Sequence, residues 1–248
     1  MSLVDWNLIR RFGDIAAADS IMSAARHILE VLRVTVVVRG SFVQKGPVLY
    51  ISNHKSGLDG MFLLSVIARD DLHMVGLASY ELLGVKFAQK LLPMYRFRKK
   101  RDYFLDIVAG GADHHILSDI SLVRRKNQDS IARGAEIVTK GGVVVIFPTG
   151  SAGRRPSQGI WKAGVGFLAK QIKNPKTQVI FVAIEGGSRR DMGRFMHPLL
   201  RTIFYRSKTV VLTFAKPVLL SKIITKEKDG KDSVWELERE YRAIFKQT

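Results

Sequence analysis

The sequence of 248 residues predicts a single α/β domain with a mostly parallel central sheet flanked by helices, preceded by an amphipathic helical segment. Short β-branched runs alternate with amphipathic stretches, which is typical of strands connected by helices. The run Val143–Phe147 has no polar position, as expected of a strand buried on both faces. No repeat or long linker divides the chain. We therefore expect a helical, membrane-interacting segment over residues 1–33 and one domain over residues 34–248.

The N-terminal segment has two predicted parts. A stripe of apolar residues recurs at helical spacing in Ile21, Ala25, Ile28, Leu29 and Leu32. Before it, Trp6, Leu8, Ile9 and Phe12 surround Arg10 and Arg11. That mixture suits a membrane interface, and it equally suits a helix that faces the core. Both interpretations stay open.

The remaining elements are assigned from periodicity and from the breaks between them. Short apolar and β-branched runs predict strands at Val34–Val38, Val48–Ser52, His73–Ala78, Val143–Phe147, Gln178–Ile184 and Thr209–Phe214. Helical spacing predicts helices at Leu58–Ala68, Glu81–Leu91, Asp129–Lys140, Ile160–Gln171 and Val234–Phe245. The pair Gly141-Gly142 closes one helix before the next strand.

No membrane-spanning or secretory segment is predicted. The most apolar early stretch, Ser20–Val38, contains Arg26, Glu30 and Arg33, which a bilayer-spanning helix rarely tolerates. The first five residues lack the charged-then-apolar order of a secretory signal. We expect a cytoplasmic protein that, where it meets a membrane, lies on it.

Composition excludes several classes of protein. With 46% hydrophobic and 25% charged residues, the chain can bury a sizeable core and is not a disordered protein. The absence of cysteine excludes disulfides, thiolate zinc sites, iron–sulfur clusters and a cysteine nucleophile. The net charge of +18, from 40 Lys and Arg against 22 Asp and Glu, predicts attraction to nucleic acid, an anionic membrane or phosphorylated substrates.

The candidate site begins with His54 and Asp59, which follow a predicted strand and precede a helix. Across the tight Ser56-Gly57 turn, Asp59 can fold back to hold one imidazole nitrogen while the other accepts a proton. The pair is therefore a candidate general base. A capping or structural histidine is the alternative. Ser56, a candidate nucleophile, also fits as a helix N-cap.

A second segment follows the apolar strand Val143–Phe147. It continues as Pro148-Thr149-Gly150-Ser151, with Arg154-Arg155 shortly after. Ligands of open α/β sheets bind at the carboxyl ends of strands, so this turn and the His54 turn are expected to border one crevice. Amides freed by glycine, beside guanidinium groups, suit a phosphate. An ordinary strand exit with solvated arginines is the alternative.

These two segments resemble the glycerolipid acyltransferase family. Asn53-His54 with Asp59 matches its first motif, NHxxxxD, and Phe147–Ser151 is similar to its third, FPEGT. The resemblance covers roughly residues 30–220. The chain departs from the family pattern at three positions: Thr149 replaces Glu, Ala152 replaces Arg, and Phe181 replaces Pro.

The resemblance implies an O-acyltransferase of phospholipid biosynthesis. It implies transfer of a fatty acyl group from an acyl carrier protein or coenzyme A thioester to a lysophospholipid, with 1-acyl-sn-glycerol 3-phosphate as acceptor and phosphatidic acid as product. The implied enzyme is peripheral on the inner face of an anionic membrane and needs no cofactor and no metal. The implied residues are His54 and Asp59 for catalysis, and Asn53, Arg98, Pro148, Thr149, Gly150, Ser151 and Arg154 for substrate binding.

Other functions stay as alternatives. In the first alternative, the protein is an acyltransferase that acts on a lysolipid with a different head group. In the second, the domain binds lipid or nucleic acid without turnover. Nucleic acid is disfavoured, because aromatic–basic RNA motifs are missing and the basic residues are scattered over many predicted loops. A metal site is also disfavoured, because His114-His115 has few carboxylates nearby.

Overall fold

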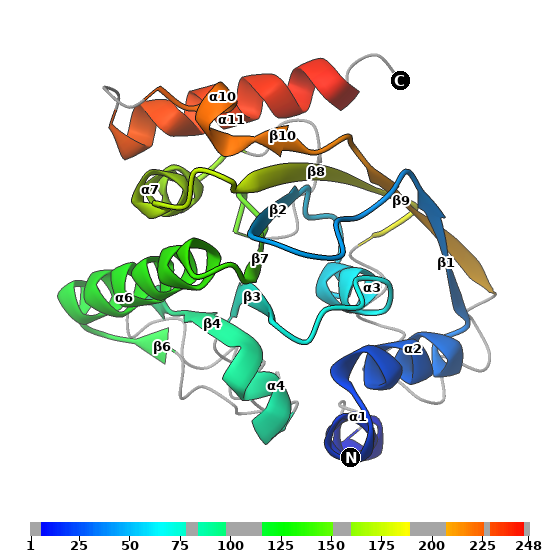
Figure 1. Cartoon of the computed structure of the whole chain (residues 1–248). Helices are drawn as coiled ribbons and strands as arrows, with labels where there is room; N and C mark the ends of the chain where they lie inside the picture. Colours follow the sequence, from blue (N-terminus) through cyan, green and yellow to red (C-terminus); the bar gives the residue numbers. More distant parts are fainter. Residues whose placement is uncertain are drawn as a thin grey trace.

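Helices cover both faces of a central sheet (Figure 1). The computed structural model describes residues 6–77, 84–97, 116–150, 160–188, 207–225 and 229–245. The strands of the main sheet are β1 (Val34–Arg39), β2 (Val48–Ser52), β3 (Leu72–Leu77), β4 (Leu91–Met94), β7 (Val143–Ile146), β8 (Gln178–Glu185), β9 (Lys208–Phe214) and β10 (Val218–Leu219). A separate pair consists of β5 (Arg96–Phe97) and β6 (Ile116–Leu117). The helices are α1 (Trp6–Ala18), α2 (Ile21–Val31), α3 (Asp59–Leu64), α4 (Val85–Lys90), α6 (Ile120–Thr139), α7 (Ala163–Gln171), α10 (Leu220–Ile223) and α11 (Gly230–Phe245).

The sheet is mostly parallel, which confirms the predicted fold class. Its order is β1-β9-β8-β2-β7-β3-β4, with β10 beside β8. The run from β8 to β4 is parallel throughout, whereas β9 pairs with β8 antiparallel. The carboxyl ends of β8, β2, β7, β3 and β4 therefore meet at one edge of the sheet, where α/β proteins bind their ligands.

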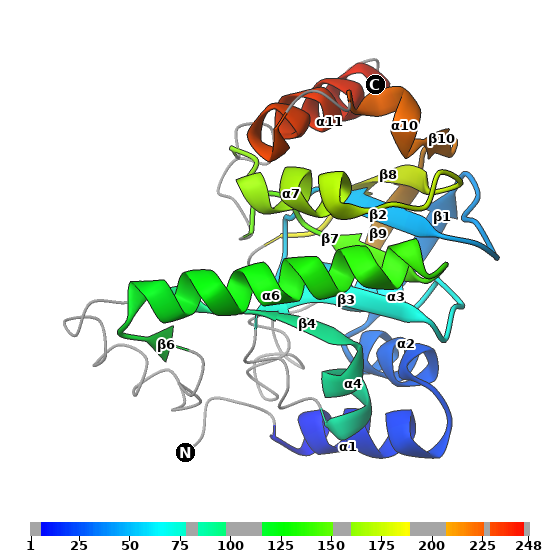
Figure 2. The ribbon, with the colours of Figure 1, turned by 60° about the vertical axis from the view of Figure 1, so that its left-hand side comes forward.

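The central strands are apolar because both of their faces are covered. Every residue of β2 and β7 is buried. One core cluster lies between the sheet and α1, α2 and α3, and a second lies between the sheet and α6, α7, α10 and α11. Figures 1 and 2 show these two layers on opposite sides of the strands. This explains why the strand runs lack the alternation of a half-exposed sheet.

The N-terminal segment forms two helices joined by a short break at Asp19-Ser20. Ser20 caps α2, because its hydroxyl accepts a hydrogen bond from the Ser23 amide at 3.0 Å. On α1, Leu8 and Phe12 are buried in the core, and the Phe12 ring meets Phe87 edge-on with centroids 5.8 Å apart. Leu8 and Phe12 thus behave as the core-facing interpretation expects. None of the described helices is long and apolar enough to cross a membrane.

The predicted helices differ in extent from the observed ones: α3 ends at Leu64 instead of Ala68, α7 begins at Ala163 instead of Ile160, and α11 begins at Gly230 instead of Val234. The helix predicted from Asp129 begins at Ile120, because Asp119 caps it by accepting hydrogen bonds from the amides of Ser121 and Leu122. After its first turn, residues Arg124–Asp129 are all polar, so the apolar periodicity is interrupted there. The helix predicted up to Leu91 ends at Lys90, and the chain then forms β4, which was not predicted. Residues 78–83 lie outside the described ranges.

Candidate active site

The parallel arrangement brings the two predicted segments together at the carboxyl edge of the sheet. His54 follows β2, and Phe147, Pro148 and Gly150 follow the neighbouring strand β7. All four residues line one cavity of about 600 Å³. The expected shared crevice is therefore present. Of the other predicted substrate-binding residues, Arg98, Ser151 and Arg154 lie outside the described ranges, and Thr149 belongs to the turn without lining the cavity.

His54 and Asp59 are in direct contact. The Nδ1 atom of His54 lies 2.8 Å from Oδ2 of Asp59. The Asp59 side chain is completely buried, whereas the His54 side chain is 17% exposed and faces the cavity. A carboxylate at Nδ1 favours the tautomer that carries its proton there, which leaves Nε2 as the acceptor. The pair can therefore take a proton from a group bound in the cavity.

Asp59 is oriented by the turn that precedes α3. Its Oδ2 atom also accepts hydrogen bonds from the amides of Lys55 at 2.5 Å and Ser56 at 2.8 Å. These donors hold the carboxylate in place at the first residue of the helix, where a negative charge is favoured. Its Oδ1 atom is buried and has no hydrogen-bond partner among the described residues. All the described hydrogen bonds to Asp59 thus converge on the oxygen that contacts His54.

Asn53 fastens the start of this turn to the next strand. Its Nδ2 donates to the Ile184 carbonyl at 3.0 Å, and its Oδ1 accepts from the Ile184 amide at 2.7 Å. The side chain thereby extends the pairing of β2 with β8 by one step beyond Ser52. Asn53 is absent from the cavity lining, so in this structure it holds the site together and does not face the ligand space.

Phe147 and the turn after it form the opposite wall. The Phe147 ring stacks on His54 with centroids 4.8 Å apart and 29° between the planes, which restrains the imidazole. The Gly150 amide, expected to be free for a phosphate, instead donates to the Phe147 carbonyl at 3.0 Å. Gly150 closes a tight turn with φ of 67°, a conformation that favours glycine. The prediction of a free amide at Gly150 was therefore wrong.

Ser56 is a poor candidate for the nucleophile. Its side chain is buried, its Oγ accepts a hydrogen bond from the Leu58 amide at 3.1 Å, and it does not line the cavity. The hydroxyl stabilises the turn before α3, but Ser56 is not the N-cap that was predicted, because the helix N-cap is Leu58.

The cavity is mostly apolar and is lined from both sides of the sheet. Its apolar lining residues are Met61, Leu64, Met74, Val75, Leu77, Phe87, Met94, Ile131, Ile146, Phe147 and Val165. The cavity lies where β3 and β7 separate. These two strands pair only from Leu72 to Met74 of β3, whereas the pairing of β3 with β4 continues to Leu77. This gap lets one cavity reach both α3 and α6. Its size is within the range of small-molecule sites.

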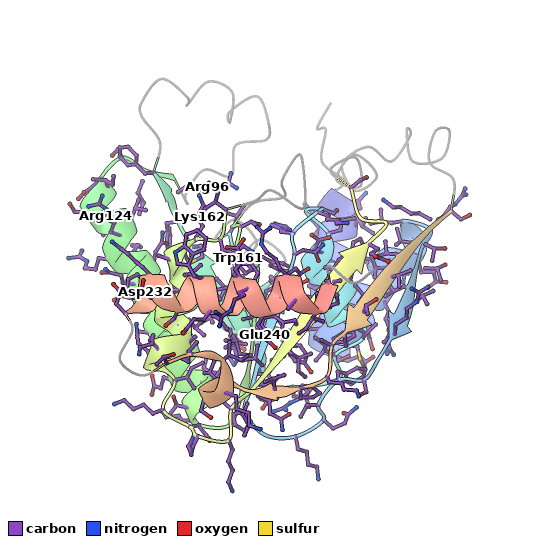
Figure 3. The ribbon with its side chains drawn as sticks, turned by 90° about the horizontal axis from the view of Figure 1, so that it is seen from above. Arg96, Arg124, Trp161, Lys162, Asp232 and Glu240 are labelled. Atoms are coloured by element: carbon purple, nitrogen blue, oxygen red, sulfur yellow. The ribbon has the colours of Figure 1, made fainter. Side chains whose placement is uncertain are left out.

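Two cationic side chains lie at the cavity. Arg96 and Lys162 both line it, and both are exposed (Figure 3). The backbone beside Arg96 is held by Asn127 of α6, which accepts from the Tyr95 amide at 2.7 Å and donates to the Tyr95 carbonyl at 3.1 Å. The Lys162 amide donates to the Pro148 carbonyl at 2.8 Å. Both cations are therefore tied to the strand ends that form the site.

Sequence reasoning missed these cations and the apolar lining. Arg96 lies two residues before the predicted Arg98, and Lys162 lies within the stretch Ile160–Gln171 that was predicted only as a helix. The lining residues of α3 and α4 were predicted only as parts of helices, because helical spacing does not distinguish a cavity wall from a packed interface. Among the described residues no group of three or more His, Asp or Glu side chains is arranged to hold a metal.

Comparison with known proteins identifies the family. The family model described as Acyltransferase matches residues 33–185. No curated protein matches the sequence. The fold is similar to the crystal structure of the 1-acyl-sn-glycerophosphate (LPA) acyltransferase PlsC from Thermotoga maritima, with a TM-score of 0.51, 14% identity, and coverage of 97% of this chain and 95% of that chain. The family model spans more than half of the sequence and includes the His54–Asp59 pair, so the chain belongs to the acyltransferase family.

Proposed function

We propose that the protein is an O-acyltransferase that moves a fatty acyl group from an acyl thioester to the free hydroxyl of 1-acyl-sn-glycerol 3-phosphate. The observation that carries this proposal is the combination of an Asp-oriented histidine with an apolar cavity that is also lined by two cationic side chains. The similar fold of the LPA acyltransferase from Thermotoga maritima supports the choice of acceptor. Phosphatidic acid is the proposed product, which places the reaction in phospholipid biosynthesis.

In the proposed reaction, His54 is the general base. Its Nε2 takes the proton from the acceptor hydroxyl as that oxygen attacks the thioester carbonyl carbon, and Asp59 stabilises the imidazolium that forms. The tetrahedral intermediate then collapses, the carbon–sulfur bond breaks, and the imidazolium returns the proton to the leaving thiolate. The thioester already supplies a good leaving group, so the proposed steps require no cofactor, no metal and no nucleophile from the enzyme.

The two parts of the cavity suit the two parts of an acyl lipid. Side chains such as Met61, Met74 and Phe87 offer an apolar wall to a fatty chain. Arg96 and Lys162 offer charge to a phosphate, and a guanidinium can bind its oxygens in a bidentate manner. These two cations add to the predicted Arg98 and Arg154 as phosphate-binding candidates.

The donor and the membrane complete the proposal. An acyl carrier protein or coenzyme A carries the thioester, and both are anionic, as is the inner leaflet of a cytoplasmic membrane. The net charge of +18 favours association with each of them. We propose that the protein works as a peripheral enzyme on that inner face, with residues 1–33 contributing to the contact.

The first test is acyl transfer by purified protein in the presence of lipid vesicles. Long-chain acyl-coenzyme A and acyl carrier protein thioesters are offered with a panel of lysophospholipids, and wild type is compared with His54→Ala. We expect turnover on lysophosphatidic acid that is lost in the variant, because general-base assistance contributes about 10²–10⁴-fold in rate. Turnover only on another lysolipid contradicts the proposed acceptor. No turnover with any pair, from folded protein that binds vesicles, contradicts the proposed enzyme.

A second test separates phosphate binding from general charge effects. Arg96→Gln and Lys162→Gln are each expected to raise KM for lysophosphatidic acid about tenfold or more, because a charge-assisted hydrogen bond is lost. Lys176→Gln is the matched control, since Lys176 is exposed and precedes β8 at the opposite edge of the sheet. Equal KM values for all three variants contradict the assignment of the two cations.

A further inference from the structure

Helix α1 packs against α4, and α4 forms part of the cavity wall. Both views of the ribbon place the two helices side by side (Figures 1 and 2). Phe87 of α4 lines the cavity, and among the six described residues of this helix it is the buried one. A helix of this length has little stability of its own. The position of α4, and with it one wall of the cavity, therefore depends on what Phe87 packs against.

Phe87 packs against Phe12 of α1. The two rings meet edge-on, with centroids 5.8 Å apart and 83° between their planes. Phe12 is fully buried, and Phe87 is 2% exposed. Phe12 does not itself line the cavity, so it lies behind the wall that Phe87 forms. An edge-to-face pair in a close-packed core holds each ring at a defined angle, so Phe12 fixes the face that Phe87 presents to the cavity.

Two further contacts hold α4 on α1. Gly84, which precedes α4, lies against Gly13, because a Cβ atom built on Gly84 would be 3.2 Å from the Gly13 Cα atom. The Nζ atom of Lys86 donates a hydrogen bond to the Ala17 carbonyl at 2.9 Å. That carbonyl belongs to the last turn of α1, where lysine side chains can satisfy helix carbonyls. Together with the aromatic pair, these contacts hold α4 along the C-terminal half of α1.

Helix α1 lies outside the region that the family model matches, which begins at residue 33. We propose that α1 is nevertheless a structural part of the substrate cavity, and that Phe12 is a positioning residue that acts through Phe87 to shape the apolar wall for a fatty chain. The inference rests on the proposed function, in which this cavity holds the acyl lipid.

The proposal predicts a defect in binding and not in the chemical step. Loss of the Phe12 ring leaves space into which Phe87 can turn, so the wall no longer fits a bound chain. The contacts that orient His54 and Asp59 come from the turn before α3 and involve neither α1 nor α4. The base is therefore expected to keep its geometry.

The first experiment measures the binding of cis-parinaric acid, a fluorescent long-chain fatty acid, by fluorescence titration. We expect Kd to rise about fivefold or more in Phe12→Leu and in Phe87→Leu. Phe42→Leu is the matched control, because Phe42 forms a ring pair with Phe214, also at 5.8 Å and in the same core cluster, and neither ring lines the cavity. A Kd of Phe12→Leu equal to that of wild type overturns the proposal, and so does an equal rise in Phe42→Leu. Phe12→Met, which conserves more of the ring volume, takes the place of Phe12→Leu if the latter does not fold.

A double-mutant cycle tests whether Phe12 acts through Phe87. In a Phe87→Leu background, the further change Phe12→Leu is expected to alter Kd by less than about twofold, because the ring that Phe12 positions is already absent. Fully additive effects of the two substitutions overturn this route.

Steady-state acyl transfer separates the inference from the proposed function. In Phe12→Leu we expect KM for the long-chain thioester or for lysophosphatidic acid to rise about fivefold, with kcat within about twofold of wild type. A fall in kcat with unchanged KM values overturns the proposal. If wild type performs no acyl transfer but the variants bind cis-parinaric acid as expected, the proposed function fails while the role of α1 in the cavity stands.

Discussion

One imidazole and one carboxylate, which differ in exposure, define the candidate base. Asp59 is fully buried among amide donors, and His54 reaches the cavity. Burial keeps water away from the carboxylate, so its interaction with Nδ1 is strong, while the exposed edge of the ring stays available to substrate. The division of roles between the two residues therefore follows from where the turn places them.

Asp59→Asn tests this division of roles. The amide oxygen can still accept from the Lys55 and Ser56 amides, so we expect the turn to survive. The same oxygen still faces Nδ1 of His54, but it no longer carries the negative charge that stabilises the imidazolium, so kcat should fall by about 10²-fold or more. The measurement is steady-state acyl transfer together with a thermal midpoint. Asp71→Asn, which removes the charge from the ion pair with Arg69, is the control. Activity of Asp59→Asn close to that of wild type would contradict the assigned role.

His73, on β3, makes stability depend on pH. Burial is the main cause that lowers its pKa, with Lys90 and Arg133 acting in the same direction, while the Asp71 carbonyl and carboxylate oppose the shift. A histidine whose pKa is lower in the folded state binds protons more readily when unfolded, so stability is lost as the pH falls through about 6.5 toward the folded value.

We therefore expect the free energy of unfolding of wild type to decrease between about pH 7.5 and pH 5.5. His73→Gln should lose less over the same interval, because glutamine does not titrate. Urea titrations of both proteins at the two pH values measure the difference. Identical pH dependence in the two proteins would show that His73 does not contribute.

At the scale of elements, the position of α11 depends on a close approach to α7. A Cβ atom built on Gly166 of α7 would overlap the Gly230 carbonyl at the start of α11 and come within 2.8 Å of Val234. Both helices cover the same face of the sheet (Figure 2). The absence of a side chain at Gly166 therefore lets α11 pack closely against α7.

Gly166→Ala is accordingly expected to destabilise the protein by about 1–3 kcal/mol, because a backbone carbonyl cannot move aside as a flexible side chain can. Gly164→Ala, on the same helix, is the matched control. A Cβ there would lie 3.5 Å from Ile131 Cδ1, an ordinary contact, and alanine favours the helix by about 1 kcal/mol. Chemical denaturation measures both. A Gly166→Ala protein as stable as Gly164→Ala would contradict the close packing.

At the scale of the whole molecule, the cavity and the net charge belong together. The cavity opens at the carboxyl edge of the sheet, and the described residues Arg96 and Lys162 add positive charge there (Figure 3). The excess of 40 basic over 22 acidic residues gives the chain a strong positive field. An anionic surface is therefore expected to attract the protein.

We expect the protein to bind vesicles that contain anionic lipid, and to bind purely zwitterionic vesicles much more weakly. The dissociation constant should rise at least about tenfold between roughly 50 and 300 mM salt, because salt screens the attraction. Vesicle sedimentation measures both effects. Competition by RNA at low concentration would instead favour the nucleic-acid alternative, and equal binding to both kinds of vesicle would contradict an electrostatic contact.

The sequence by itself determined the α/β class, the central strands and the His54–Asp59 pair. Uninterrupted apolar runs such as Val143–Ile146 are readable because a strand buried on both faces tolerates no polar residue. The pair is readable because its five-residue separation closes within a single turn. Local patterns of this kind need no knowledge of the rest of the fold.

Only the tertiary structure decided the cavity, the two cationic side chains beside it and the hydrogen bonds of Asn53 to Ile184. The cavity depends on where β3 parts from β7, and the Asn53 hydrogen bonds depend on the pairing of β2 with β8. Both join segments far apart in the chain. Spacing along the sequence reports which face of a helix or strand a residue occupies, but the neighbour across the interface is set by the packing of whole elements.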